Sequence, residues 1–217
     1  MTEVDETSII DFTEKINTMY DFYTDLERQF LELSFIIPLD NPDKTYSPRL
    51  YDILQSACGQ VENMSRILCD KLNLKYSKKD KKFPTYYGLL NQKGMLESQI
   101  VYVVKTKQVI KPFVITSGET PDWWQGYNNT KHELPEGILQ GNIKNTVHAL
   151  SALCALHRIS YSAYPQLPIL NGKNWYQQFP IERMDPTTLK HTLREQVPVL
   201  SSNMMFYCLT NFGGMYE

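Results

Sequence analysis

The sequence lacks the features by which several classes of protein are recognised. No apolar run reaches the length of about 20 residues that spans a membrane, and no basic start is followed by an apolar stretch. The four cysteines are widely spaced, form no C-x-x-C pair and make no convincing set of metal ligands with the histidines; they are Cys58, Cys69, Cys154 and Cys208. We therefore expect a soluble, cytoplasmic protein with free, mostly buried thiols and without a structural metal or cofactor.

An excess of charge of one sign is also missing. The 22 Lys and Arg residues against 24 Asp and Glu residues leave a net charge of -2, so any contact with a nucleic acid has to be local. The ten glycines are scattered and form no phosphate-binding loop, and the G-x-S-x-G and H-E-x-x-H motifs are absent. With 217 residues, of which 42% are hydrophobic, the chain can bury one substantial core, and we expect a single domain over residues 1–217.

Two long amphipathic helices are predicted in the first third of the chain. Between Ile9 and Leu33 apolar residues recur in steps of three and four, and the prolines of "PLDNPDKTYSP" end this helix. Its apolar stripe suits packing within the chain, and it would also suit a partner protein. Ser47 as N-cap and Pro48 at the first helical position begin a second helix, which the pattern extends to about residue 72.

Lysines dominate the segment after the second helix. The run "KLNLKYSKKDKKFP" has six lysines against one aspartate, and its densest part consists of Lys78, Lys79, Lys81 and Lys82. Such a run is usually a mobile, solvated loop. Its functional interpretation is an RNA-contact patch for phosphates beside Tyr76, Tyr86 and Tyr87.

The amino-acid composition changes in the middle of the chain. Residues 98–115 are rich in Val and Ile with a polar interruption, which predicts a small β-hairpin insertion lying on the helices. Thr120 as N-cap and Pro121 then predict a helix over 122–133.

The last strong pattern begins at Gly141 and Asn142 and predicts a helix up to about residue 164. Beyond it the periodicity fades, and 165–217 is interpreted as an irregular C-terminal extension in which "SSNMMFYCL" is a strand or a tucked apolar segment. Together these elements predict a mainly α fold, a bundle of about four to five helices with its core in 9–164.

Proton-transferring and amide side chains are concentrated in "DWWQGYNNTKH". On a helix, Trp124, Asn128 and His132 share one face, and the adjacent line holds Trp123, Tyr127 and Lys131. Histidine exchanges protons near neutral pH and an amide can bind a phosphate, so Asn128 and His132 are the candidate site. On the pattern alone, aromatic residues on a helix are mostly core and a nearby histidine often satisfies a buried carbonyl.

Four polar side chains outside this stretch are interpreted as having no part in chemistry on the pattern alone. Glu62 lies one step from the apolar stripe of the second helix, so it faces a buried polar partner or water, and water is the commoner case. His157 is interpreted as a hydrogen-bonded core residue, His148 as structural or exposed and His191 as a surface residue.

The order of several segments along the chain resembles that of a known protein family. "SACGQVENMSRIL", then "KPF", then "WWQGYNNTKH" and an alanine-rich helix resemble bacterial proteins within or near the HEPN superfamily of small helical nucleotide-binding and ribonuclease domains. That superfamily's motif is R-N-x-x-x-H. Asn128 and His132 match it, whereas Tyr127 occupies the position of the arginine. The resemblance covers roughly residues 9 to 164.

The resemblance implies a HEPN-like helical bundle that forms a homodimer, in which two motifs meet in a metal-independent ribonuclease site of a bacterial defence or toxin-antitoxin type system. RNA would be the partner and no cofactor is involved. His132 would act as general acid or base and Asn128 would position the phosphate. Lys131 would supply a positive charge in place of the arginine, and Tyr127, Glu62 and Trp124 would support the site.

A second hypothesis needs no chemistry. The chain is then a non-catalytic interaction or dimerisation module with a degenerate motif, and the helix over 122–133 packs on the helix over 142–164. This hypothesis predicts that Trp123 and Trp124 are deeply buried and that His132 binds a carbonyl or Glu62.

Overall fold

The computed structural model describes residues 6–132, 136–162 and 206–208. Within these ranges the chain forms five α-helices, α1 (Glu6–Leu33), α2 (Pro48–Lys71), α3 (Phe83–Gln92), α4 (Asp122–His132) and α5 (Ile143–Ser162). Two 3-10 turns, η1 (Lys78–Asp80) and η2 (Glu136–Gln140), precede α3 and α5. The strands are β1 (Val101–Val103), β2 (Gln108–Ile110) and β3 (Phe206–Cys208). The predicted mainly helical fold with a small hairpin is confirmed.

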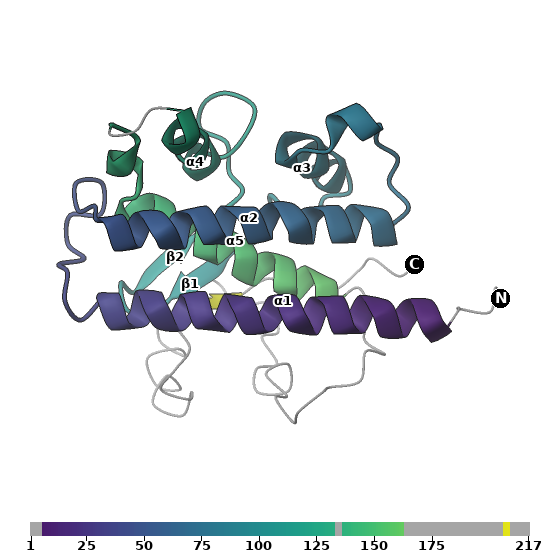
Figure 1. The fold of residues 1–217 in the computed structure, drawn as a ribbon, viewed down its shortest axis with the longest axis horizontal. Coiled ribbons are helices and arrows are strands. Elements are labelled where there is room, and N and C mark those ends of the chain that lie inside the picture. Colours follow the sequence, from purple (N-terminus) through teal and green to yellow (C-terminus); the bar gives the residue numbers. More distant parts are fainter. Residues whose placement is uncertain (1–5, 133–135, 163–205, 209–217) are drawn as a thin grey trace.

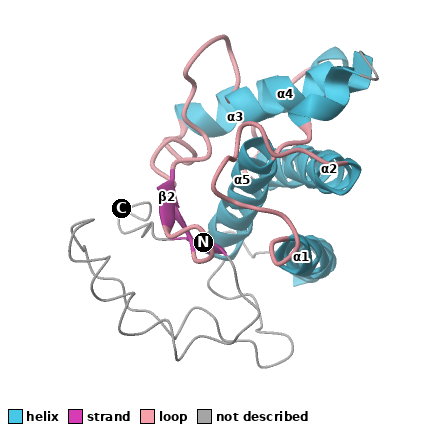
Figure 2. Ribbon diagram, turned by 90° about the vertical axis from the view of Figure 1, so that its left-hand side faces the viewer, coloured by secondary structure: helices cyan, strands magenta, loops and turns pink. Residues whose placement is uncertain are grey.

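Helix α2 is the centre of the bundle, because it contacts α1, α3, α4 and α5. In Figure 1, α1 and α2 run side by side with α5 behind them, and the two shorter helices lie on the outer side of α2. Helix α3 covers the C-terminal half of α2 and α4 covers its N-terminal half. Figure 2 shows the sheet beside α5, away from α2. The elements that carry the candidate residues are therefore spread along one helix.

Helix α1 packs within its own chain, on α2 and α5. Its predicted stripe is buried at Phe12, Ile16, Tyr23, Leu26 and Phe30. Burying a large apolar side chain contributes about 1.5–3 kcal/mol, so this stripe accounts for much of the stability of the helix. None of the helices in the described ranges is long and apolar enough to cross a membrane.

Local capping signals place two of the helix starts correctly. Ser47 Oγ accepts a hydrogen bond from the Leu50 amide at 3.1 Å, with proline in the first turn of α2. Asn142 Oδ1 accepts from the Asn145 amide at 2.9 Å and begins α5 in the same way. The prediction that Thr120 caps α4 is wrong by one residue.

The residue that precedes α4 is Pro121. Its carbonyl accepts hydrogen bonds from the amides of Trp124 at 2.9 Å and Gln125 at 3.2 Å. A proline there is compatible with the helix because the first amides of a helix have no partner within it.

Helix α3 was not predicted from the sequence. Its buried residues are Phe83, Tyr86, Tyr87 and Leu90, which have the i, i+3, i+4, i+7 spacing of a helix face. Pro84 lies in its first turn, where proline is tolerated. The signal was therefore present, but the lysine run before it favoured a loop.

The predicted hairpin is part of a three-stranded sheet with the order β2-β1-β3. Val101 pairs with Ile110 in the antiparallel hairpin, and Tyr102 pairs with Tyr207 on the other side of β1. The expected strand in "SSNMMFYCL" is thus present at residues 206–208. The remainder of the predicted extension, 163–205 and 209–217, and His191 within it, lie outside the described residues.

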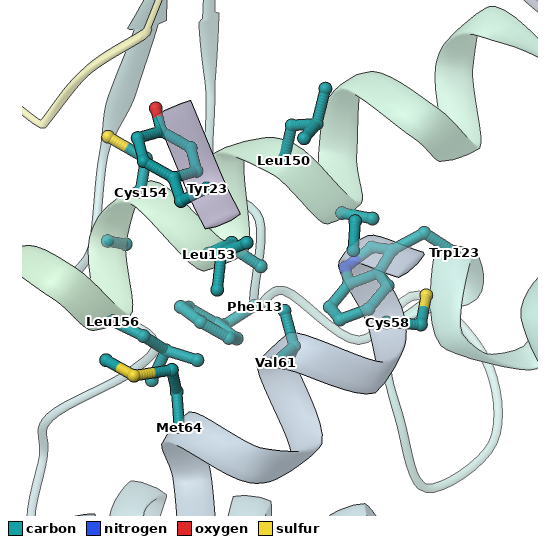
Figure 3. Packing of buried hydrophobic residues seen from close by; sticks show 14 of the residues in the cluster. Tyr23, Cys58, Val61, Met64, Phe113, Trp123, Leu150, Leu153, Cys154 and Leu156 are labelled. Atoms are coloured by element: carbon teal, nitrogen blue, oxygen red, sulfur yellow. The ribbon is translucent and has the colours of Figure 1, made fainter. Parts of the chain in front are cut away.

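The loop after the hairpin is inserted into the core. Figure 3 shows Phe113 beside Val61 of α2 and Leu153 and Leu156 of α5. Two hydrogen bonds hold this loop: the Tyr87 hydroxyl donates to the Phe113 carbonyl at 2.8 Å, and the Trp123 indole donates to the Pro112 carbonyl at 2.6 Å. The loop therefore joins α3 and α4 to the central helices. Cys58, Cys69 and Cys154 are free thiols buried in this core, as expected.

Candidate functional site

Both faces of α4 that carry the candidate residues contribute to the core. Trp123 is 2% exposed, Trp124 is 3% exposed and Tyr127 is 6% exposed. The Trp124 ring centre lies 4.2 Å from that of Phe83 and 5.0 Å from that of Tyr127. Contacts of this kind contribute about 0.5–1.5 kcal/mol beyond area burial, so these three rings fix α4 on α3. The motif therefore starts within the hydrophobic core.

The polar end of α4 begins at Asn128, which is partly buried, followed by the exposed Asn129. Lys131 and His132 form the last turn of α4, and their side chains lie outside the described part of the structure. The structure thus places Asn128 at the edge of the packed face of the helix. The predicted bond of His132 to a carbonyl or to Glu62 stays a prediction.

Thr130 fixes this end of α4 to the start of α2. Gln55 donates from Nε2 to Thr130 Oγ1, and Thr130 Oγ1 donates to the Tyr127 carbonyl at 2.6 Å. The Tyr51 hydroxyl donates to the Thr130 carbonyl at 3.5 Å. Tyr51 and Gln55 are one helical turn apart and so share a face of α2. Sequence reasoning missed all three residues, because nothing local connects positions 75 residues apart.

Gly137 allows η2 to approach the same residue. A Cβ atom at position 137 would lie 2.8 Å from Thr130 Cα, closer than such atoms approach in proteins. The backbone between α4 and α5 therefore closes tightly over Thr130.

Glu62 has a structural role that differs from the predicted one. It is partly buried, and its Oε1 accepts a hydrogen bond from the Phe83 amide at 2.9 Å. The residue before α3, Lys82, provides no side-chain cap, so Glu62 satisfies an otherwise unpaired amide at the start of this helix. Of the two alternatives for Glu62, the structure shows the polar partner and not the commoner case of a carboxylate that faces water alone.

The lysines predicted as an RNA-contact patch are exposed, as expected, but they lie far from α4. They lie in η1 and directly after it, beyond the C-terminal end of α2, whereas Gln55, which holds Thr130, is near the N-terminal end of α2. The 16 residues from Gln55 to Lys71 extend about 24 Å at 1.5 Å per residue. Figure 1 shows η1 and the C-terminal end of α4 over opposite ends of α2. A single chain therefore does not combine the lysines and the motif in one site.

The tyrosines expected beside the lysines do not form an exposed stacking surface. Tyr86 and Tyr87 are buried, and Tyr76 is partly buried with its hydroxyl donating to the Asp70 carboxylate. Bases would therefore find no exposed ring of Tyr86 or Tyr87 on which to stack. The predicted contact of the lysines with phosphates stays a prediction.

Helix α5 carries two histidines, His148 and His157, that lie in different surroundings. His157 is a core residue, but within the described ranges neither of its ring nitrogens has a hydrogen-bond partner, which contradicts the prediction of a hydrogen-bonded histidine. Burial lowers the pKa of His157 to about 3. Burial also lowers the pKa of the partly buried His148, and the nearby Lys144 acts in the same direction. Among the described residues, no three His, Cys, Asp or Glu side chains gather in a way that could hold a metal ion.

Comparison of the chain with protein-family models, curated proteins and solved structures gives no match.

Proposed function

We propose that this protein is a non-catalytic helical interaction module in which the motif-bearing helix α4 serves packing. The observation that carries the proposal is the environment of Tyr127. This residue stands where a HEPN motif has an arginine, and it is 6% exposed with its ring against Trp124. A phenol in the core offers no positive charge and no bidentate contact to a phosphate.

The burial of both tryptophans supports the same proposal. A helix whose first two turns are fixed by Trp123, Trp124 and Tyr127 has a structural reason for its aromatic residues. The hydrogen bonds of Thr130 to Tyr51 and Gln55 of α2 likewise give the end of α4 a structural role. These contacts explain most of the motif without a reaction.

The outer face of α1 is the surface that we propose for a partner protein. Phe22 at the middle of this helix is 58% exposed and lies between the exposed Asp21 and Asp25. Five exposed carboxylates line the face, against two exposed basic residues; the carboxylates belong to Asp11, Glu14, Asp21, Asp25 and Glu32. A symmetric pair would place like charges opposite one another, so this face suits a basic protein partner better than a second copy.

An RNA-directed, metal-independent ribonuclease of a defence or toxin-antitoxin type is the second candidate. The observation that favours it is the position of Asn128, which is only partly buried at the edge of the packed face of α4. In this candidate His132 transfers protons, Lys131 supplies charge and two chains pair to complete the site. Tyr127 is the residue that weakens it.

One assay distinguishes the two candidates. Labelled single-stranded RNA is incubated in EDTA with the wild type, His132→Ala and the matched control Asn129→Ala, which removes an exposed amide from the same turn. The proposed module leaves the RNA intact in all three reactions. Cleavage that His132→Ala abolishes and Asn129→Ala retains would overturn the proposal in favour of the ribonuclease. A monomeric solution mass would in turn count against the ribonuclease, because that site requires two chains.

A further inference from the structure

The segment from residue 75 to residue 82, which we call the lysine turn, carries an excess of unpaired positive charge. Its five lysines, all exposed, stand against a single aspartate and leave a net charge of +4; they are Lys75, Lys78, Lys79, Lys81 and Lys82. In the described part of the chain none of these ammonium groups lies within ion-pair distance of a carboxylate.

The acidic residues closest in sequence are occupied by other donors. The Asp80 carboxylate accepts a hydrogen bond from the Ser77 hydroxyl at 2.6 Å. Asp70 accepts from the Tyr76 hydroxyl, and the Arg66 guanidinium lies 3.7 Å from its other oxygen. The lysine turn therefore keeps its charge available to a ligand from outside the chain.

The lysine turn is solvated, as expected, and its middle part forms the 3-10 turn η1. Ser77 caps η1, because its Oγ accepts from the Lys79 amide at 3.3 Å and its carbonyl accepts from the Asp80 amide at 3.1 Å. At the far end, Glu62 holds the Phe83 amide at 2.9 Å. The Tyr76 hydroxyl, near the start of the lysine turn, donates to Asp70 of α2, so hydrogen bonds to α2 lie near both ends of the turn. Binding then needs little ordering of the backbone.

We propose that the lysine turn binds the phosphate backbone of a nucleic acid without reading its sequence. Lysine ammonium groups are point charges that contact single phosphates, and clustered lysines release counterions when they do so. Tyr86 and Tyr87 are buried, so they supply no stacking surface for bases. The large exposed apolar side chains lie elsewhere in the described chain, so the lysine turn has no apolar anchor for a lipid bilayer.

This surface goes beyond the proposed function and does not depend on it. It lies at the opposite end of α2 from α4, so it can bind a backbone whether or not α4 supports catalysis. RNA and DNA offer the same phosphate chemistry, and the experiment includes both.

The test is fluorescence anisotropy with a labelled 20-nucleotide RNA and a DNA of the same sequence, titrated with the full chain at 50 to 200 mM salt. If four lysines each neutralise one phosphate of a single strand, the slope of log K against log salt is about -2.8, and affinity falls about 50-fold over this range. The quadruple variant Lys78→Gln, Lys79→Gln, Lys81→Gln, Lys82→Gln should lose this slope and most of the binding at 50 mM salt.

A matched control removes the same four charges from other exposed positions, namely Lys44→Gln, Lys93→Gln, Lys107→Gln and Lys111→Gln. It should bind as the wild type does. Equal losses in both variants would overturn the proposal, because net charge alone would then explain binding. The proposal would also be overturned if the wild type bound neither RNA nor DNA at 50 mM salt. Binding to vesicles of anionic lipid or to a polyglutamate peptide in place of nucleic acid would count in the same way. Circular dichroism and the melting temperature confirm that each variant is folded.

Discussion

Protonation of His157 should make the fold sensitive to acid. The imidazole is 1% exposed, and it lies with its ring centre 5.4 Å from those of both Tyr20 and Tyr23 of α1. Burial lowers its pKa from 6.5 to about 3, so the folded protein keeps the ring neutral. The unfolded chain binds a proton below pH 6.5. The free energy of unfolding is therefore highest above pH 6.5 and falls as the pH drops towards 3.

These pKa values set the magnitude. One pKa unit corresponds to about 1.4 kcal/mol, so the full loss below pH 3 is about 5 kcal/mol. Between pH 7.5 and pH 5.0 the same linkage gives a loss of about 2 kcal/mol. That is a large part of the 5–15 kcal/mol by which domains are usually stable.

The perturbation is His157→Phe, which keeps a flat ring between the two tyrosines and removes both nitrogens. Urea unfolding at pH 7.5 and 5.0 measures the free energy of unfolding of both proteins. We expect the wild type to lose about 2 kcal/mol more than the variant between the two pH values. At pH 7.5 the variant should be at least as stable, because it no longer buries two unpaired polar atoms. Equal pH dependence of the two proteins would refute the reasoning.

Two further predictions concern the helices around α4. Glu62→Ala should lower the free energy of unfolding by about 1 kcal/mol in urea titrations, because it leaves the Phe83 amide without its acceptor. Glu62→Gln should keep most of the stability, because the amide oxygen of glutamine can still accept this hydrogen bond. Equal losses in the two variants would show that the charge and not the hydrogen bond matters. Gly126→Ala should destabilise by about 1–3 kcal/mol, since its Cβ would lie 2.6 Å from Asn145 Nδ2, which would have to give up its hydrogen bond of 3.0 Å to the Gln140 carbonyl. Gly59→Ala on α2, with nothing within 4 Å, should stabilise by about 0.5–1 kcal/mol. Melting temperatures of the two variants that move together in differential scanning calorimetry would contradict this.

The parts of the fold that the sequence predicted are those with local signals. Ser47 and Asn142 cap helices within three residues of themselves, and the stripe of α1 repeats with the period of a helix. The hairpin also follows from neighbouring residues, as its paired strands are separated by a short turn. Local patterns of this kind can be read from one sequence because both partners lie within the same few turns.

The candidate site was predicted only in part. The helical placement of Asn128 and His132 is correct, but Trp124 and Tyr127 belong to the core, and Glu62 caps α3. Which face of α4 is buried depends on Phe83, 41 residues away from Trp124, and no local pattern contains that contact.

The sequence by itself determined the number and period of the long helices, the free buried cysteines and the residues of the motif. Only the tertiary structure decided which of them meet. Thr130 binds Gln55 across 75 residues, β3 joins the hairpin from the end of the chain, and α2 keeps the lysine turn apart from α4. The physical reason is that helix formation depends on interactions within a few residues, whereas a site depends on which distant surfaces bury each other.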